Sequence, residues 1–326
     1  MAGIEIRNVS ARNLWIGGKI ITPVPKLGDK WTEVADSISW VSGIYALCSH
    51  KGELYGGSYG NARLVRYDGA GTGWTDIAKP SINQTWIYSL ASHTDGELYG
   101  GTANDGLLVR YDEGVGDGLT TVGDSTASSI HSLISHDGDI YGGTGISAGT
   151  LLRYEVGTGW VTVASSTSSQ GRILSLATHN GELYGGTYSG GRLFRFDEGV
   201  GTGWTEVAGA LESQGSIHAL CSHGGNLYGG TGTGGRLFKW NESDAWEEVA
   251  GAIESQTDIY SLCSHGGELY GGTGPNGMLF RYDSGGGWTK VADYINYQQW
   301  ILSLCSHTDG YLYGGTYGGG NLFRWD

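Results

Sequence analysis

The sequence predicts an all-β protein that folds as a seven-bladed β-propeller with four-stranded blades. Three observations lead to this prediction: a unit repeated at a fixed period, turn signals that divide each unit into four short strands, and a segment near the N-terminus that supplies the strand missing from the last unit. No segment shows a sustained 3.6-residue periodicity of apolar residues, so we expect almost no helix.

The repeat is anchored by a Tyr-Gly-Gly triplet that occurs seven times, each preceded by a histidine. Successive histidines lie 42 to 44 positions apart, a period typical of solenoids, propellers and arrays. Because the histidine recurs in every unit, we expect each side chain to satisfy backbone groups of its own blade rather than to bind a metal or act in catalysis. These residues are His50, His93, His136, His179, His223, His265 and His307.

Each unit divides into four strands separated by turn residues. In the unit that begins at Ile173, Asn180-Gly181 joins the first two strands, and Asn-Gly between apolar runs is a strong hairpin signal because both residues tolerate positive φ. A four-stranded unit of this length corresponds to one propeller blade. The strands predicted for this unit are 173–178, 182–187, 192–197 and 204–208.

The two ends of the chain complement each other. The last unit stops after a third strand at residues 323–326, and the segment 31–35 (WTEVA) copies the fourth strand at 204–208. We therefore expect strand 31–35 to complete the last blade and close the ring, which protects sheet edges from pairing with other chains. This divides the chain into an N-terminal arm, residues 1–30, and a propeller, residues 31–326.

One unit carries Gly56-Gly57 at the end of its second strand, Tyr67 on its third and Trp74 at the start of its fourth. This pattern resembles the kelch-repeat propellers, and the resemblance extends over residues 31–326. The units are shorter than the ~50 residues usual for kelch repeats, and the WD-repeat signature is absent. Kelch-like propellers mostly bind proteins and a few are enzymes, so the resemblance implies a fold and leaves the activity open.

Composition restricts the partners and the compartment. The net charge of −14 and the pI near 5.0 argue against nucleic acid and anionic membrane as partners. No apolar run is long enough to insert in a membrane, and no signal peptide precedes the ring, so we expect synthesis in a cytoplasm with reduced thiols. Cys48, Cys221, Cys263 and Cys305 share one repeat position, which suggests small buried residues rather than metal ligands or disulfides.

The arm is too apolar to extend freely into water. It carries Ile4, Ile6, Leu14, Trp15 and Ile16. We expect it either to pack on its own ring or to dock on another subunit, and the sequence favours neither.

Residues that break the repeat mark a candidate partner-binding patch. In a propeller, the loops that enter the first strands share one face, here called the upper face, with the turns between second and third strands. Three tryptophans fall in such loops of consecutive sectors, with tyrosines and amides beside them. The predicted patch consists of Trp40, Trp86, Trp300, Tyr59, Tyr317, Tyr297, Asn61, Gln84, Gln298 and Gln299.

Three interpretations of this patch stay open. Trp and Tyr rings serve as anchors in protein interfaces. Rings flanked by amides also suit a sugar, whose C–H face packs on an aromatic ring. Alternatively, the rings plug the gaps between blades. His131 and His218, on first strands, are interpreted as packing positions.

No catalytic constellation, cofactor motif or metal-ligand spacing stands apart from the repeat. We therefore expect a non-enzymatic binding or structural module that recognises a protein or a surface glycan as part of a larger assembly. A virion or tail-like particle is the placement we favour by analogy. A free lectin is the alternative, and an enzyme with its site at the channel mouth is the second alternative.

Overall fold

The computed structural model describes most of the chain. The described residues are 14–16, 19–21, 31–36, 41–69, 73–80, 84–114, 118–125, 127–145, 149–165, 171–211, 214–253, 255–293 and 298–325. Ile4, Ile6, Trp40 and Tyr297 lie outside these ranges. Of Leu14, Trp15 and Ile16, only the backbone is described.

Every regular element in the described residues is a β-strand, as predicted. First strands are β4 (Gly43–His50), β8 (Ile87–Ser92), β12 (Ile130–His136), β16 (Ile173–His179), β20 (Ser216–His223), β24 (Asp258–His265) and β28 (Trp300–Ser306). Second strands are β5 (Glu53–Tyr59), β9 (Leu98–Thr102), β13 (Asp139–Thr144), β17 (Glu182–Thr187), β21 (Asn226–Gly232), β25 (Glu268–Gly274) and β29 (Leu312–Tyr317).

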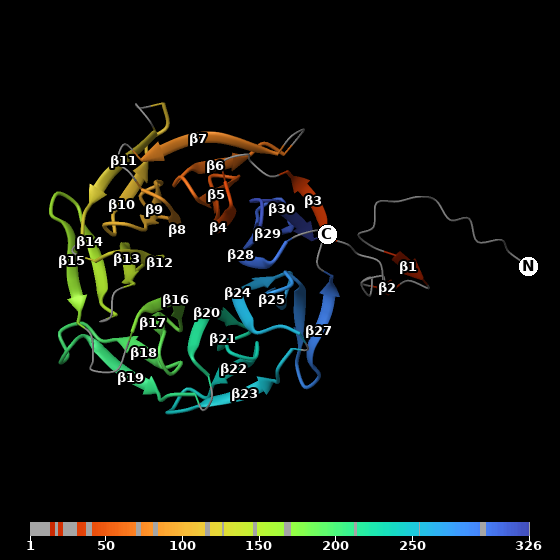
Figure 1. Cartoon of the computed structure of the whole chain (residues 1–326). Coiled ribbons are helices and arrows are strands. Elements are labelled where there is room, and N and C mark those ends of the chain that lie inside the picture. Colours follow the sequence, from red (N-terminus) through yellow and green to blue (C-terminus); the bar gives the residue numbers. More distant parts are fainter. Residues whose placement is uncertain are drawn as a thin grey trace, which may run out of the picture.

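Third strands are β6 (Leu64–Tyr67), β10 (Leu108–Tyr111), β14 (Leu151–Glu155), β18 (Leu193–Phe196), β22 (Leu237–Trp240), β26 (Leu279–Asp283) and β30 (Leu322–Trp325). Fourth strands are β7 (Trp74–Pro80), β11 (Gly118–Gly123), β15 (Gly159–Ala164), β19 (Trp204–Ala208), β23 (Trp246–Ala250), β27 (Gly287–Ala292) and β3 (Thr32–Ala35). The 28 strands β3 to β30 fit about seven four-stranded blades. Figure 1 shows the blades arranged in a ring, with the first strands inside and the fourth strands at the rim.

The N-terminal strand completes the sheet at the other end of the chain. Strand β3 pairs antiparallel with β30, and Thr32 lies opposite Arg324. Trp31 is buried in one cluster with Phe323 and Leu312. The predicted pairing of the segment 31–35 with the last unit is therefore confirmed.

The two glycines of each Tyr-Gly-Gly triplet make room for different neighbours. A Cβ on Gly185 would lie 3.0 Å from the Trp204 ring, which belongs to the same blade. A Cβ on Gly186 would lie 2.8 Å from Ile217, on the first strand of the next blade. The first glycine therefore seats the tryptophan in every blade except that of Gly100, whose fourth strand carries Leu119 instead, and the second glycine sets how closely the blades approach. The pairs of second glycine and next-blade isoleucine are Gly57–Ile87, Gly101–Ile130, Gly143–Ile173, Gly186–Ile217, Gly230–Ile259, Gly272–Ile301 and Gly315–Ile44.

The repeated histidines join neighbouring blades, which corrects the expectation that each serves its own blade. His179 Nδ1 shares a hydrogen bond of 2.9 Å with Ser222 Oγ, on the first strand of the next blade. The same contact recurs at every histidine and forms a cycle with lengths of 2.7 to 3.0 Å. The pairs are His50–Ser92, His93–Ser135, His136–Thr178, His179–Ser222, His223–Ser264, His265–Ser306 and His307–Ser49.

The arm contributes one hairpin to the described structure. Strands β1 (Leu14–Ile16) and β2 (Lys19–Ile21) pair with each other as a two-stranded sheet. Figure 1 draws this hairpin outside the ring. The described part of the chain contains no helix long and apolar enough to cross a membrane.

Candidate functional site

Each innermost strand carries a β-bulge at its upper end. The pairing of β4 with β5 shifts register between Ile44 and Ala46, which leaves Tyr45 as the extra residue. The same shift recurs in the other first strands. Bulges re-aim side chains next to functional sites. The bulge residues are Tyr45, Tyr88, His131, Leu174, His218, Tyr260 and Leu302.

Bulge residues and loop residues together form a continuous arc of rings around the upper mouth of the ring, here called the aromatic crown. It consists of His131, Tyr88, Tyr45, Trp86, Tyr59, Tyr317, Trp300, Tyr260 and His218. Neighbouring ring centroids lie 4.5 to 5.9 Å apart along the arc. Each of these side chains is partly buried, so the rings support one another and keep one side toward solvent.

Two stacked pairs are the most ordered parts of the crown. Tyr59 and Trp86, on adjacent blades, stack at 5.0 Å with an interplanar angle of 18°. Trp300 and Tyr317, on one blade, stack at 4.5 Å and 24°. Tyr59 and Tyr317 meet edge to face at 5.6 Å and connect the two pairs. The structure therefore brings together four residues of the patch predicted from the sequence.

A glycine at the centre of the crown allows this connection. Gly43 occupies in β4 the repeat position that Trp86 and Trp300 occupy in their own units. A Cβ on Gly43 would lie 3.2 Å from the Tyr317 ring. The first unit thus has Gly43 where two other units have Trp86 and Trp300, and Trp40 lies outside the described residues.

The predicted amides divide between the core and the surface. Gln298 is buried; its Oε1 accepts a hydrogen bond from Thr316, and its Nε2 donates to Asn321 at 3.2 Å. Gln298 thus supports the wall behind the crown rather than its open surface. Gln84 is also buried, and its Oε1 has no partner among the described residues. Gln299 and Asn61 are exposed.

The arc is open on one side, at blade β16–β19. Leu174 takes the bulge position there, and Arg172 takes the loop position. The guanidinium of Arg172 lies over the ring of Tyr188, 5.4 Å from its centroid. Tyr188 is 48% exposed, so this side of the mouth presents a cation on an aromatic support.

The His218 end of the crown carries an acid. His218 Nε2 lies 3.4 Å from Asp258 Oδ1 and 3.1 Å from Ser216 Oγ. Burial acts to raise the pKa of Asp258, but hydrogen bonds from His218 and Thr257 lower it below its ordinary value. A serine nucleophile and its orienting carboxylate need opposite nitrogens of the histidine, whereas here both lie at Nε2.

Burial determines the protonation states of the tyrosines and of His131 in the crown. It raises the pKa of Tyr45 and of Tyr260 to about 12. Burial, assisted by the charge of Arg172, lowers the pKa of His131 to about 4. At neutral pH these phenols therefore stay protonated and His131 stays uncharged, so the crown offers hydrogen-bond donors on an apolar wall.

Sequence reasoning missed five crown residues: Tyr45, Tyr88, Tyr260, His131 and His218. From the sequence, His131 and His218 are interpreted as packing positions, because they alternate with the three tyrosines at one repeat position. The signal that could have found them is variation at the bulge position. Its side chain is aromatic, imidazole or aliphatic in different units, whereas the residue before it is isoleucine in every unit. When one position of a regular repeat varies in this way, its side chain is less constrained by core packing than its neighbours are.

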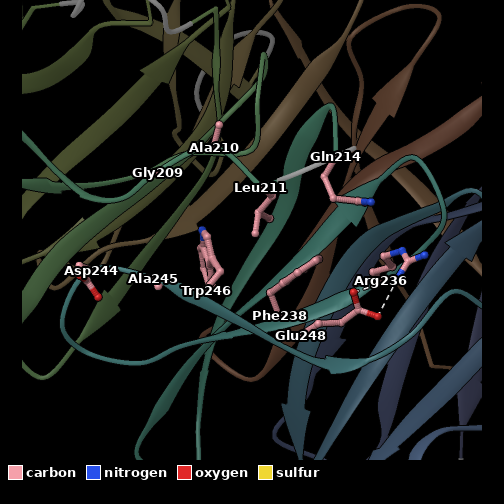
Figure 2. Close-up of a pocket in the computed structure, with 10 residues that line it drawn as sticks. All are labelled: Gly209, Ala210, Leu211, Gln214, Arg236, Phe238, Asp244, Ala245, Trp246 and Glu248. Atoms are coloured by element: carbon pink, nitrogen blue, oxygen red, sulfur yellow. Dashed lines mark hydrogen bonds and ion pairs between the residues drawn. The ribbon is translucent and has the colours of Figure 1, made fainter.

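A separate concavity lies between two blades, away from the crown. Figure 2 shows this pocket of about 610 Å³, which is lined by Leu211, Gln214, Phe238, Trp246 and the ion pair of Arg236 with Glu248. The Trp246 indole N–H has no partner there, but Trp160, Trp204 and Trp288 at the same repeat position share this property. The pocket is therefore a by-product of blade packing, and its charged groups already pair with each other.

The first strands below the crown carry four partly buried cysteines. Four consecutive blades place Cys221, Cys263, Cys305 and Cys48 on their first strands, and burial raises the pKa of each thiol. No group of three or more His, Cys, Asp or Glu side chains in the described ranges is placed to hold a metal ion.

Comparison of the chain with known proteins shows similarity in structure rather than in sequence. No family model matches the chain, and no curated protein matches its sequence. Virginiamycin B lyase from Staphylococcus aureus superposes with a TM-score of 0.74 at 12% identity, over 90% of this chain and 98% of the lyase. The WD40 β-propeller domain of Doa1 superposes with a TM-score of 0.67 at 11% identity, over 91% of this chain and 97% of that domain. The fold is that of a β-propeller.

Further propellers agree with this fold. YCF48 from Cyanidioschyzon merolae superposes with a TM-score of 0.66 at 13% identity, over 91% of this chain and 98% of YCF48, and YCF48 is also known bound to a D1 peptide. The extracellular domain of a hybrid two-component system from B. thetaiotaomicron matches with a TM-score of 0.68 at 18% identity. The match covers 90% of this chain but 39% of that domain. These structures include an enzyme and a protein that is known bound to a peptide, and the kelch resemblance stays a prediction.

Proposed function

We propose that this chain is a seven-bladed propeller, closed by strand β3, that binds a segment of a partner protein on its aromatic crown. The observation that carries the proposal is the continuity of the crown: nine rings from blades far apart in sequence form one surface around one mouth. Partly buried Trp and Tyr rings are the side chains that most often anchor protein partners.

The tyrosine hydroxyl groups of the crown favour a peptide as the ligand, because they can donate hydrogen bonds to its backbone carbonyls. In the described part of the chain, no hydrogen bond engages the hydroxyls of Tyr45, Tyr59, Tyr88 or Tyr317. A peptide offers a carbonyl acceptor at every residue, so an extended segment could meet several of these donors while its side chains pack on the rings. The binding of a D1 peptide by YCF48 gives a precedent within the same fold.

A glycan-binding function is the second candidate, because stacked rings beside free hydroxyls also suit a sugar face. We rank it below peptide binding, since the amides predicted to recognise sugar hydroxyls include the buried Gln298 and Gln84. An enzymatic function has less support, because the His218 cluster lacks the geometry of a nucleophilic triad. We therefore propose a non-enzymatic module.

The test of the binding function is selection from a library of random seven-residue peptides on the immobilised protein. Tyr317→Ala removes one crown ring, and Tyr311→Ala is its matched control because Tyr311 precedes the opposite end of the same strand, β29. We expect Tyr317→Ala and Trp86→Ala to weaken the selected peptides at least tenfold, as for interface anchors, and Tyr311→Ala to leave them unchanged. If no peptide is enriched, peptide binding is wrong, and retention on a glycan array would then favour the lectin.

We also propose that the arm attaches the ring to a larger assembly, such as a virion or tail-like particle. The support is limited to the apolar arm and the separate β1–β2 hairpin. The measurement is the native mass of the full chain beside that of a chain lacking residues 1–24. Assembly of only the full chain supports attachment, whereas two monomers contradict it.

A further inference from the structure

We propose that Arg172, at the open side of the aromatic crown, binds a carboxylate of the partner segment and so makes the site selective for acidic peptides. The inference rests on the peptide-binding function proposed above and specifies the ligand of that site. The guanidinium of Arg172 lies over the ring of Tyr188 and has room to pair with a carboxylate.

The backbone around Arg172 is held in place on both sides. Tyr188 N donates a hydrogen bond to Arg172 O at 2.9 Å, and Gly171 N donates to Tyr188 O at 3.1 Å. The side chain then extends over the Tyr188 ring, which restricts the guanidinium to one region of the upper face. A positioned guanidinium loses less conformational entropy on binding than a free one.

Arg172 differs from the other basic residues of its blade, because the described residues include no acidic partner for it. Arg192 pairs with Glu206, and Arg195 pairs with Asp197. No acidic side chain within the described residues pairs with Arg172, although the whole chain carries a net charge of −14. An exposed arginine left unpaired in an acidic protein is free to pair with a ligand.

The neighbours of Arg172 in the crown add donors but no competing acid. His131 stacks on Tyr88 at 4.5 Å, and the positive charge of Arg172 acts on the pKa of both. Both groups are uncharged at neutral pH, and both can donate a hydrogen bond. Donors beside a planar guanidinium match a carboxylate, which accepts two parallel N–H bonds from the fork.

The His218 end of the arc, on the other side of the gap from His131, is unfavourable for a carboxylate. Asp258 lies at the His218 end, where its negative charge repels a carboxylate. An acidic segment is therefore expected to place its carboxylate at Arg172 and its apolar or aromatic side chains on Trp86 and Tyr59. The carboxylate can come from an Asp or Glu side chain or from a free C-terminus, and these two sources share the same chemistry.

The experiment uses the full chain and a library of random seven-residue peptides displayed with free C-termini. Selected peptides are synthesised in three forms: unchanged, with Asp and Glu replaced by Asn and Gln, and with an amidated C-terminus. We measure the dissociation constant of each form by titration of wild type, Arg172→Gln, Arg172→Lys and Arg192→Gln. Arg192→Gln is the matched control, because it removes a paired arginine from the same blade.

For wild type and Arg192→Gln, we expect one of the two peptide changes, either the Asn and Gln replacements or the C-terminal amide, to weaken binding about tenfold. This is the usual effect of losing a charge-assisted hydrogen bond. On Arg172→Gln, the acidic and neutral forms should bind equally, and Arg172→Lys should fall between because it keeps the charge but not the fork. The form that loses affinity identifies the source. Thermal unfolding of each variant confirms that this exposed substitution leaves the fold intact.

Two results overturn the inference alone. The first is equal binding of the acidic and neutral forms to wild type. The second is a preference for the acidic form that survives in Arg172→Gln. In both cases Trp86→Ala still weakens binding at least tenfold. Failure to select any peptide overturns this inference together with the proposed function.

Discussion

His307 Nδ1 shares a hydrogen bond of 2.8 Å with Ser49 Oγ, although 258 positions separate the two residues in sequence. His307 follows the first strand of the last blade, and Ser49 lies on the first strand of the blade that begins with β4. The bond is equivalent to the other histidine–hydroxyl bonds, which join blades consecutive in sequence. The contact between the last blade and the blade of β4 is thus built from the same parts as the other junctions.

Breaking this bond is expected to cost about 1 kcal/mol of unfolding free energy, the usual net value of a hydrogen bond. His307→Ala and Ser49→Ala should each lower the melting temperature by about 2 °C. The double variant should lose less than the sum of the two, because both changes remove one interaction. Thermal unfolding of the four proteins measures the coupling, and strict additivity contradicts a shared bond.

The second glycine of the triplet should tolerate no side chain. A Cβ on Gly315 would lie 2.7 Å from both Ile44 and Ser303, so Gly315→Ala should destabilise the protein by about 1–3 kcal/mol through overpacking. Gly209→Ala is the control, because its Cβ would meet nothing closer than 3.6 Å. Denaturant unfolding compares the two, and equal stability of both variants would show that the blade junction can relax.

Removal of the closing strand should expose a sheet edge. A chain lacking residues 1–36 loses Trp31 and β3, which leaves β30 unpaired on one side. Unpaired edges promote association, so we expect swapped dimers or aggregates and a lower melting temperature. A chain lacking residues 1–30 keeps the strand and is the control. Size-exclusion chromatography with mass detection distinguishes them, and a monomeric 37–326 chain with unchanged melting contradicts closure by β3.

Acid should destabilise the protein through His131. Burial, followed by the charge of Arg172, lowers its pKa to about 4 from an ordinary value of 6.5. Between these values the unfolded chain binds a proton that the folded chain does not, so stability is lost as the pH falls from 6.5 to 4. The loss is at most about 3 kcal/mol and smaller where solvent reaches the ring.

His131→Phe keeps a ring in the crown and removes this titration. The variant should show a shallower decline of unfolding free energy between pH 6.5 and 4 than wild type. The depressed pKa of Asp258 acts in the same direction but below the ordinary Asp value of 3.8, so its contribution falls in a different window. Parallel pH profiles for the two proteins would show that His131 titrates normally.

The thiols should react slowly in the folded protein. Burial raises the pKa of Cys48 and Cys263 to about 11 and of Cys221 to about 12, so little thiolate exists at pH 8. We expect alkylation by iodoacetamide at least tenfold slower than for the same chain in denaturant, where the pKa returns to about 8.5. Mass spectrometry follows the reaction, and equal rates in both states contradict the raised pKa of these thiols.

The sequence by itself determined the secondary structure and the pairing within each blade. Asn180-Gly181 sets a hairpin by local backbone geometry, and the predicted strands 182–187 and 204–208 coincide with β17 and β19. The copy of WTEVA at 31–35 identified β3 as a partner of β30, because an exact repeat carries its own pairing register. These features depend on residues close in sequence or on the repeat itself.

Only the tertiary structure decided which side chains of neighbouring blades contact one another. Trp86 and Trp300 were predicted as parts of one patch, but their link through Tyr59, Tyr317 and Gly43 depends on the rotation from blade to blade. That rotation comes from side-chain packing, such as Ile44 against Gly315, and no local sequence signal encodes it. For the same reason the sequence revealed the repeated histidines but not their partners on the next blade.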